Sequence, residues 1–134
     1  MGFKNFKTGI YTPTGNYVGN KAVKYRSSYE LEFCKVLDAA NCVASWGYEC
    51  IWIRYRYRGK PRSYLVDFIV TLTNGQKFLI EVKPRSFYDR AMQTRDMNWH
   101  KWNAAISFCQ QRNWQFKVIT EQSIPVLAKL WCKA

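Results

Sequence analysis

The chain has 134 residues, 48% of them hydrophobic, and its 21 Lys and Arg against 9 Asp and Glu give a net charge of +12. This length predicts a single domain, residues 1–134, and no apolar run approaches the roughly 18 residues of a membrane span. The positive charge and abundant aromatic residues favour a polyanionic partner, with nucleic acid ahead of an acidic membrane.

The cysteines and the single histidine, His100, exclude further functions. The five cysteines contain no CxxC pair. A zinc site or an HNH-type nuclease is therefore not expected. The polar sequence after Met1 does not predict a signal peptide, and reduced cysteines in an intracellular protein fit best.

Residues 1–24 combine basic residues with Gly, Asn and Thr and show little periodicity. This pattern predicts an extended basic N-terminal arm rather than a separate domain. Lys4, Lys7, Lys21 and Lys24 could contact phosphates. Equally, the arm could be a plain strap over the core.

Ser27 and Glu30 predict the start of a helix that runs to about Ala40, because Ser at the N-cap with Glu three residues later forms a capping box. The inward stripe contains Phe33, Leu37 and Ala40. Glu30 lies on the same stripe, so it could simply cap the helix or reach a site at the core.

Residues 49–58 alternate strictly and predict a strand with one buried and one cationic face. Residues 58–62 read as the turn into the next strand. The basic residues of the strand and turn could contact successive phosphates without reading bases, or could protect a solvated sheet edge. These candidate DNA contacts are Arg54, Arg56, Arg58, Lys60 and Arg62.

The chain is organised around residues 64–83, where two β-branched and aromatic runs flank Asn74-Gly75, a strong hairpin signal. A two-residue loop would put Asp67 and Glu81 on opposite faces. A three-residue loop, with Gly75 left-handed in a bulge, puts them opposite each other. We predict the bulged register, because it gives one wholly apolar face: Val66, Phe68, Val70, Leu72, Phe78, Ile80 and Val82.

Asp67 and Glu81, placed opposite each other, would repel. A divalent cation between them reverses that sign, and carboxylate oxygens suit Mg²⁺ or Mn²⁺ better than Zn²⁺. Lys83 lies on the same side, where it could orient a water or offset charge on a phosphate. The alternative is a solvated hairpin face with scattered charges.

After Pro84 stops the strand, residues 85–97 read as a polar loop. A helix over 98–112 would bury Trp99, Trp102, Ile106 and Cys109, with Lys101 off that stripe but able to face a groove. A strand over 114–120 and a helix over 123–132, capped by Ser123 and apolar through Ile124, Leu127, Leu130 and Trp131, complete the order αβββαβα. The predicted class is α/β (α+β), with a central mixed sheet flanked by helices.

Glu30 on the first helix, Asp67, and Glu81-Val82-Lys83 on the next strand resemble the PD-(D/E)xK nuclease superfamily, although Val66 replaces the usual Pro. More of the chain resembles the head-completion nuclease family of contractile-tailed phages. The hairpin also resembles the N-terminal domain of the TnsA transposition endonucleases. The segments that resemble the phage family are 9–13, 17–19, 25–31, 46–49, 64–68, 80–84, 101–105 and 112–121.

The resemblance implies a restriction-endonuclease-like core and a metal-dependent DNA endonuclease that acts at the capsid portal vertex during virion assembly. Asp67, Glu81 and the Val82 carbonyl would hold Mg²⁺ (or Mn²⁺), with Glu30 reaching it through water or holding a second ion. Lys83 would position the attacking water. The implied partners are DNA and portal or neck proteins, in the host cytoplasm or at the virion neck.

Two other classes of function remain open. The chain could be a structural head-closure protein whose nuclease fold no longer turns over. It could also be a basic DNA-binding module whose acids are caps and surface charges. Metal-dependent cleavage separates the enzyme from both, and association with portal or neck proteins separates the two alternatives.

Overall fold

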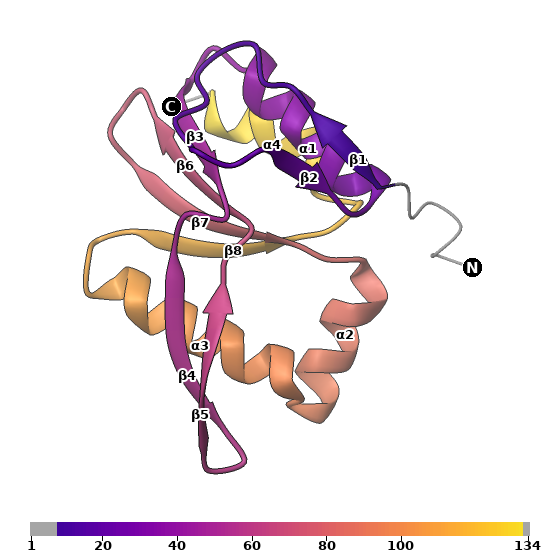
Figure 1. Cartoon of the computed structure of the whole chain (residues 1–134), viewed down its shortest axis with the longest axis vertical. Helices are drawn as coiled ribbons and strands as arrows, with labels where there is room; N and C mark the ends of the chain where they lie inside the picture. The colour runs from indigo at the N-terminus through magenta and orange to yellow at the C-terminus, as the bar shows by residue number, and fades with distance from the viewer. Residues whose placement is uncertain (1–7, 133–134) are drawn as a thin grey trace.

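The computed structural model describes residues 8–132, and its centre is a four-stranded mixed sheet (Figure 1). The strand order is β3-β6-β7-β8. β6 runs antiparallel to both of its neighbours, β3 and β7, whereas β7 and β8 are parallel. Their bounds are β3 Val43–Tyr48, β6 Phe68–Leu72, β7 Lys77–Val82 and β8 Gln115–Ile119.

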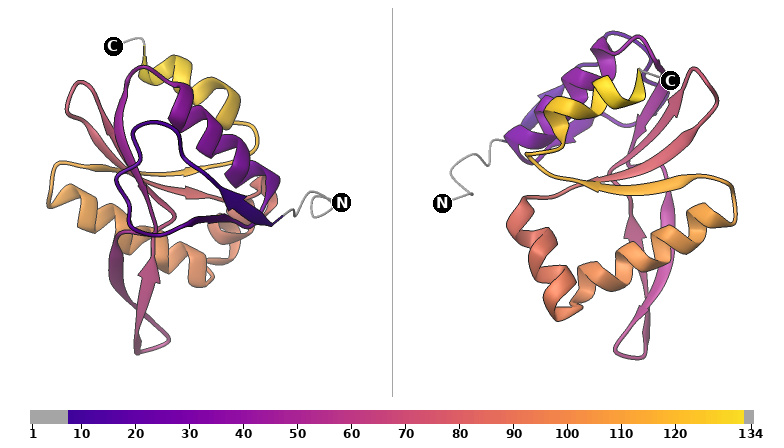
Figure 2. Two further views of the ribbon diagram at one scale, coloured as in Figure 1. Left: turned by 45° about the horizontal axis from the view of Figure 1, so that its top comes forward. Right: turned by 180° about the vertical axis from the view of Figure 1, so that it is seen from behind.

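Helices cover both faces of the sheet (Figures 1 and 2). α1 (Ser28–Ala39) and α4 (Ile124–Trp131) bury Phe33, Leu37 and Trp131 against one face. α2 (Arg85–Thr94) and α3 (Met97–Gln110) bury Ala91, Trp102 and Ala105 against the other. The predicted α/β (α+β) class, with a mixed sheet between helices, is therefore confirmed, and the sheet, α1, α3 and α4 follow the order αβββαβα.

The first strand of that order differs from the prediction. Residues 49–58 do not enter the sheet; β4 (Trp52–Tyr57) pairs with β5 (Lys60–Leu65) in a separate ribbon that projects away from it (Figure 1). The predicted turn over 58–62 was also too long. Arg58 and Gly59 both have positive φ (51° and 74°), which makes a two-residue hairpin turn, so Lys60 already pairs with Tyr57.

The described part of the arm lies as a strap over α1 and β3. β1 (Gly9–Tyr11) pairs with β2 (Val23–Tyr25), and Tyr17 bridges to Trp46. Asp38 on α1 accepts hydrogen bonds from the Tyr11 hydroxyl, the Thr14 amide and the Trp46 indole, and these bonds tie the strap down. Lys4 and Lys7 lie outside the described residues.

The β6–β7 hairpin has the predicted bulged register. Phe68 pairs with Ile80 and Val70 with Phe78, while the Leu72 amide donates to the Gln76 carbonyl across a three-residue loop. Gly75 has φ +91°, which only glycine adopts without strain. The prediction for Val66 is wrong: it packs in the α3-side core, because the chain leaves β5 and bends before β6 begins.

Three helix predictions also need correction. Residues 85–97 are not a loop, since Pro84 is the N-cap of α2, whose only buried residue is Ala91. On α3 and α4, Ile106 and Leu130 are 41% and 63% exposed rather than buried. Ser123 precedes α4 without capping it, because its hydroxyl accepts from the Thr120 amide.

The expectation of reduced cysteines is wrong for two of the five. Cys42, in the turn after α1, and Cys132, directly after α4, form a disulfide across a sequence separation of 90. The packing of α1 against α4 brings these distant positions together. Cys34, Cys50 and Cys109 are free. Among residues 8–132, no helix is both long and apolar enough to cross a membrane.

We predict that the disulfide stabilises the fold, because it closes a long loop in the unfolded chain. For a loop of this length the chain-entropy contribution is about 4.6 kcal/mol, which corresponds to a melting temperature shift of roughly 15 °C. Cys42→Ser should lower the melting temperature by that amount in oxidising buffer, and reductant should do the same to the wild type. Cys50→Ser, at an exposed free cysteine, is the control; a wild type insensitive to reductant would contradict the prediction.

Candidate active site

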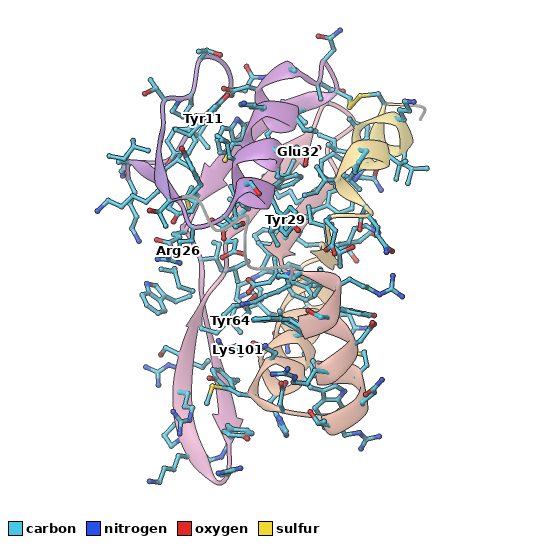
Figure 3. The ribbon with its side chains drawn as sticks, turned by 90° about the vertical axis from the view of Figure 1, so that its right-hand side faces the viewer. Tyr11, Arg26, Tyr29, Glu32, Tyr64 and Lys101 are labelled. Atoms are coloured by element: carbon cyan, nitrogen blue, oxygen red, sulfur yellow. A yellow bond between two sulfur atoms is a disulfide. The ribbon has the colours of Figure 1, made fainter. Side chains whose placement is uncertain are left out.

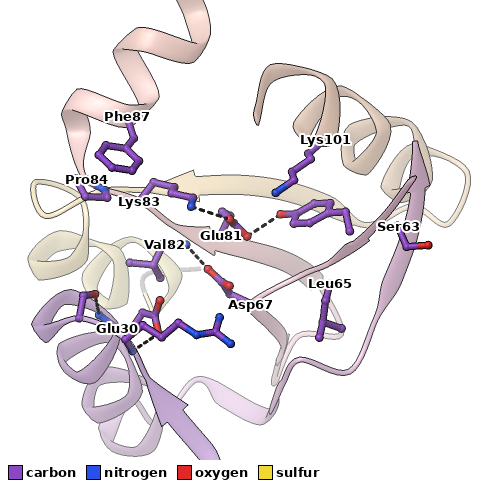
Figure 4. A pocket seen from close by; sticks show the side chains of 13 residues that line it. Glu30, Ser63, Leu65, Asp67, Glu81, Val82, Lys83, Pro84, Phe87 and Lys101 are labelled. Atoms are coloured by element: carbon purple, nitrogen blue, oxygen red, sulfur yellow. Dashed lines mark hydrogen bonds and ion pairs between the residues drawn. The ribbon is translucent and has the colours of Figure 1, made fainter. Parts of the chain in front are cut away.

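A cleft of about 410 Å³ opens where β7 leaves the sheet (Figure 4). Its walls come from the start of α1, the start of α2, α3 and the β5 strand. The side chains that carry chemistry in it are Glu30, Tyr64, Asp67, Glu81, Lys83 and Lys101. The structure therefore brings together all four predicted catalytic residues.

Asp67 and Glu81 are held opposite each other by the hairpin register. The register that pairs Thr71 with Lys77 and Phe68 with Ile80 puts Asp67, one residue before β6, at the position next to Glu81. One Asp67 oxygen, Oδ2, accepts the Val82 amide at 3.0 Å, and the Asp67 carbonyl accepts the Glu49 amide. The backbone amides of Val82 and Glu49 thus hold the side chain and the main chain of Asp67 in place next to Glu81.

Glu81 is only 4% exposed and has two further partners. Tyr64, itself buried, donates its hydroxyl to Oε1 at 2.7 Å, and the Lys83 ammonium lies 3.8 Å from Oε2. Lys101 adds positive charge from α3, with its ammonium 5.4 Å from the centre of the Tyr64 ring (Figure 3). A buried carboxylate is stable only with such partners.

The two carboxyls hold protons more tightly than free side chains do. Burial raises the pKa of Asp67 well above its usual range, and the Glu81 charge raises it further. The hydrogen bond from the Val82 amide and the charge of Lys83 lower this pKa but do not cancel the rise. Burial also raises the pKa of Glu81, while Lys83, the Tyr64 hydroxyl and Lys101 oppose that rise. The pair therefore favours a shared proton or a cation between its oxygens.

Glu30 reaches the cleft from the first turn of α1. The Ser27 hydroxyl accepts the Glu30 amide, as predicted for a cap, and Glu30 Oε1 accepts the Arg26 amide at 2.9 Å. Burial raises the pKa of Glu30 to about 7, and the Asp67 charge adds to that rise. Glu30 is both a helix cap and part of the cleft, so neither interpretation excludes the other.

The donor set fits a hard divalent cation only in part. Asp67 and Glu81 supply carboxylate oxygens next to Val82, and oxygen donors suit Mg²⁺ or Mn²⁺. Within the described residues, however, no three or more His, Cys, Asp or Glu side chains lie close enough together to bind a metal ion. Glu30 therefore does not complete a three-carboxylate cluster with the pair in this conformation.

The sequence did not predict a role for Tyr64, and it left Lys101 open. The prediction put Tyr64 at the start of the hairpin strand, whereas it belongs to a separate strand, β5, and Lys101 was placed off the apolar stripe of its helix. Glu49, which had no assigned role, pairs with Arg26 at 3.4 Å and Lys21 at 3.9 Å and so joins the strap to the sheet.

The five candidate DNA contacts are all exposed, but they do not share one face. Residues directly opposite in an antiparallel ribbon point to the same side, so Arg54 goes with Ser63, and Tyr55 with Arg62. Arg54 and Arg56 lie on the ribbon face opposite Tyr55 and Tyr57, and Arg54 also borders a groove beside Ser107 and Gln111 of α3. Lys60 and Arg62 share the face that carries Tyr55 and Tyr64 toward α3.

Comparison with known proteins places the chain in a family. The sequence profile of TnsA-like endonuclease N-terminal domains matches residues 40–121. The chain belongs to this family. It is also 29% identical over 126 residues, 80% of this chain and 84% of the relative, to the head completion nuclease of Enterobacteria phage T4.

The family match covers the part of the cleft built from the sheet. Asp67, Glu81 and Lys83 lie inside residues 40–121, as do Tyr64 and Lys101, whereas Glu30 and the strap lie outside them. A family of endonucleases and a cleft with two opposed carboxylates support the same function. The chain therefore belongs to a family of nucleases.

We predict that the metal-free protein loses stability as pH rises from about 4.5 toward about 7. The Glu30 pKa rises from 4.5 to about 7 on folding, so the folded state binds this proton more tightly, and the resulting stability is present at low pH and lost through that window. Glu30→Gln should flatten this slope in urea unfolding curves. Glu32→Gln, at an exposed acid on the same helix, should leave it unchanged. Equal slopes for wild type and Glu30→Gln would contradict the prediction.

Proposed function

We propose that this chain is a metal-dependent endonuclease that hydrolyses phosphodiester bonds of DNA. The observation that supports it best is the Asp67–Glu81 pair: two carboxylates held opposite each other at a buried sheet end, with Lys83 3.8 Å from one of them. A fold tolerates such a repulsion more easily when a cation neutralises it.

Asp67 and Glu81 would hold the ion, with the Val82 carbonyl beside them and Glu30 acting through water or on a second ion. When bound, Mg²⁺ or Mn²⁺ supplies an acidified water and stabilises negative charge on the phosphoryl oxygens. Tyr64 and the Val82 amide orient the two carboxylates through their hydrogen bonds. Lys83 orients the attacking water and offsets the charge that builds up on the phosphate.

We further propose that the protein acts during virion assembly, on DNA at the capsid portal vertex, with portal or neck proteins as partners. Support comes from the head completion nuclease of phage T4, whose match covers 80% of this chain, more than the 61% spanned by residues 40–121. It would work in the host cytoplasm or at the virion neck.

Two other functions have an observation in their favour. A TnsA-like transposition endonuclease is favoured by the family match alone. A head-closure protein without turnover is favoured by the lack of a three-carboxylate cluster among residues 8–132. Cleavage with divalent metal would rule out the second.

The test of the enzymatic proposal is plasmid digestion with Mg²⁺, Mn²⁺ or EDTA. We expect wild type to cut only with metal, and Asp67→Asn to lose cleavage because a ligand is lost while the fold is kept. Lys83→Ala should lower the cleavage rate at least about 100-fold, as expected when a group that acts on the reacting water is removed. Asp89→Asn, at an acid on α2 outside the cleft lining, is the matched control and should cut normally. Cleavage by Asp67→Asn, or by wild type in EDTA, would contradict the proposal.

A further inference from the structure

The basic residues of the β4–β5 ribbon are divided between two surfaces that differ in their surroundings. On the ribbon face opposite Tyr55 and Tyr57, Arg56 donates to the Gly59 carbonyl at 2.8 Å, which engages it in the ribbon turn, and Arg54 lies beside the exposed Trp52 at the edge of α3. On the α3 side the basic residues instead rest on aromatic rings. These two surfaces therefore present different groups to a nucleic acid.

Tyr57 is the centre of the α3-side group. The guanidinium carbons of Arg58 and Arg62 lie 5.2 and 5.8 Å from its ring centre. The ring also contacts His100 of α3, with centroids 5.2 Å apart, so the ribbon tip is anchored to the start of that helix. A guanidinium stacked on a ring keeps its N–H edge free for a phosphate and loses less side-chain entropy on binding.

The same surface continues into the cleft. Arg62 and Tyr64 alternate along β5 on one face, about 7 Å apart from the rise of a strand. Tyr64 has the Lys101 ammonium over its ring and donates its hydroxyl to Glu81, so Lys101 lies where the β5 face meets the carboxylate pair. Figure 3 shows Tyr64 and Lys101 side by side where the ribbon meets α3. Lys101, Arg62 and Arg58 thus form a row, here called the α3-side row, that leads from Glu81 to the ribbon tip.

We infer that DNA leaving the cleft lies along the α3-side row, with Lys101, Arg62 and Arg58 binding its phosphates, and not along the Arg54–Arg56 face. This inference rests on the proposed function, because it assumes DNA in the cleft. It replaces the sequence-based set of five equivalent contacts by a directional surface, and it adds Lys101, which lies on a different element. The contacts are to the backbone and carry no base readout.

The experiment compares two double variants that remove the same charge from opposite faces of one ribbon. Arg58→Gln/Arg62→Gln and Arg54→Gln/Arg56→Gln are titrated against a fluorescent duplex of random sequence in EDTA, across a range of KCl concentrations. Both variants lose the same net charge, so long-range electrostatic attraction to DNA changes equally in each. EDTA removes divalent metal, so binding is measured without cleavage. Arg62→Gln/Lys101→Gln is a second test that leaves the ribbon turn intact, and melting temperatures verify folding.

We expect both variants of the α3-side row to flatten the dependence of log K on log salt, by about 0.9 for each lost phosphate contact, and Arg54→Gln/Arg56→Gln to keep the wild-type slope. The inference is overturned if the Arg54/Arg56 variant flattens the slope as much, or if no variant changes it. Either result leaves metal-dependent plasmid cleavage intact as a separate finding. A wild type that binds no DNA at all would overturn the proposed function as well.

Discussion

The structure depends on the burial of two carboxylates against each other at the end of the β6–β7 hairpin. Asp67 and Glu81 have raised pKa values because they are desolvated, and Asp67 also because of its neighbour's charge. Groups from several elements offset the cost of burying the two carboxylates. Tyr64 comes from the ribbon, Lys101 from α3, and Lys83 and the Val82 amide from β7 and its continuation. Such an arrangement costs stability, and arrangements of this kind are concentrated at functional sites.

The hairpin tolerates the cost of burying these two carboxylates because its other face belongs to a well-packed core. Phe68, Val70, Phe78 and Ile80 are buried against α1 and α4, and the disulfide joins those two helices at one end. On the site face, Leu79 continues the α3-side core until Glu81 begins the cleft. Within two residues of β7, the side chains on this face change from a core residue, Leu79, to a cleft residue, Glu81. The packed core next to the cleft keeps the Glu81 carboxylate in a fixed position.

The hairpin and the cleft were predictable because local signals determine them. Gly75 needs a positive φ, and the strict alternation around it leaves one register with an apolar face. That register is enough to place Asp67, Glu81 and Lys83 together. Glu30 was predictable because a capping signal and the helical period agree on its direction.

The elements that escaped prediction lack such a local signal. β3 contains Ser45 and Gly47 and is largely buried on both faces, so it does not alternate. β5 begins with Lys60 and Pro61 and resembles a turn, so Tyr64 was assigned to the hairpin strand instead of to a strand of the ribbon. Partners that are distant in sequence, such as the two bridged cysteines and Lys101 beside Tyr64, follow only from tertiary packing.

The most direct test of the account is the melting temperature as a function of MgCl₂ or MnCl₂ for wild type, Asp67→Asn and Lys83→Ala. A cation that binds the folded state stabilises it by mass action, about 2.7 kcal/mol at a hundredfold excess over the dissociation constant. We predict a clear rise in melting temperature for wild type, most of that rise for Lys83→Ala, whose side chain is no ligand, and much less for Asp67→Asn. If metal raises the melting temperatures of wild type and Asp67→Asn equally, Asp67 is not a ligand and the central claim is wrong.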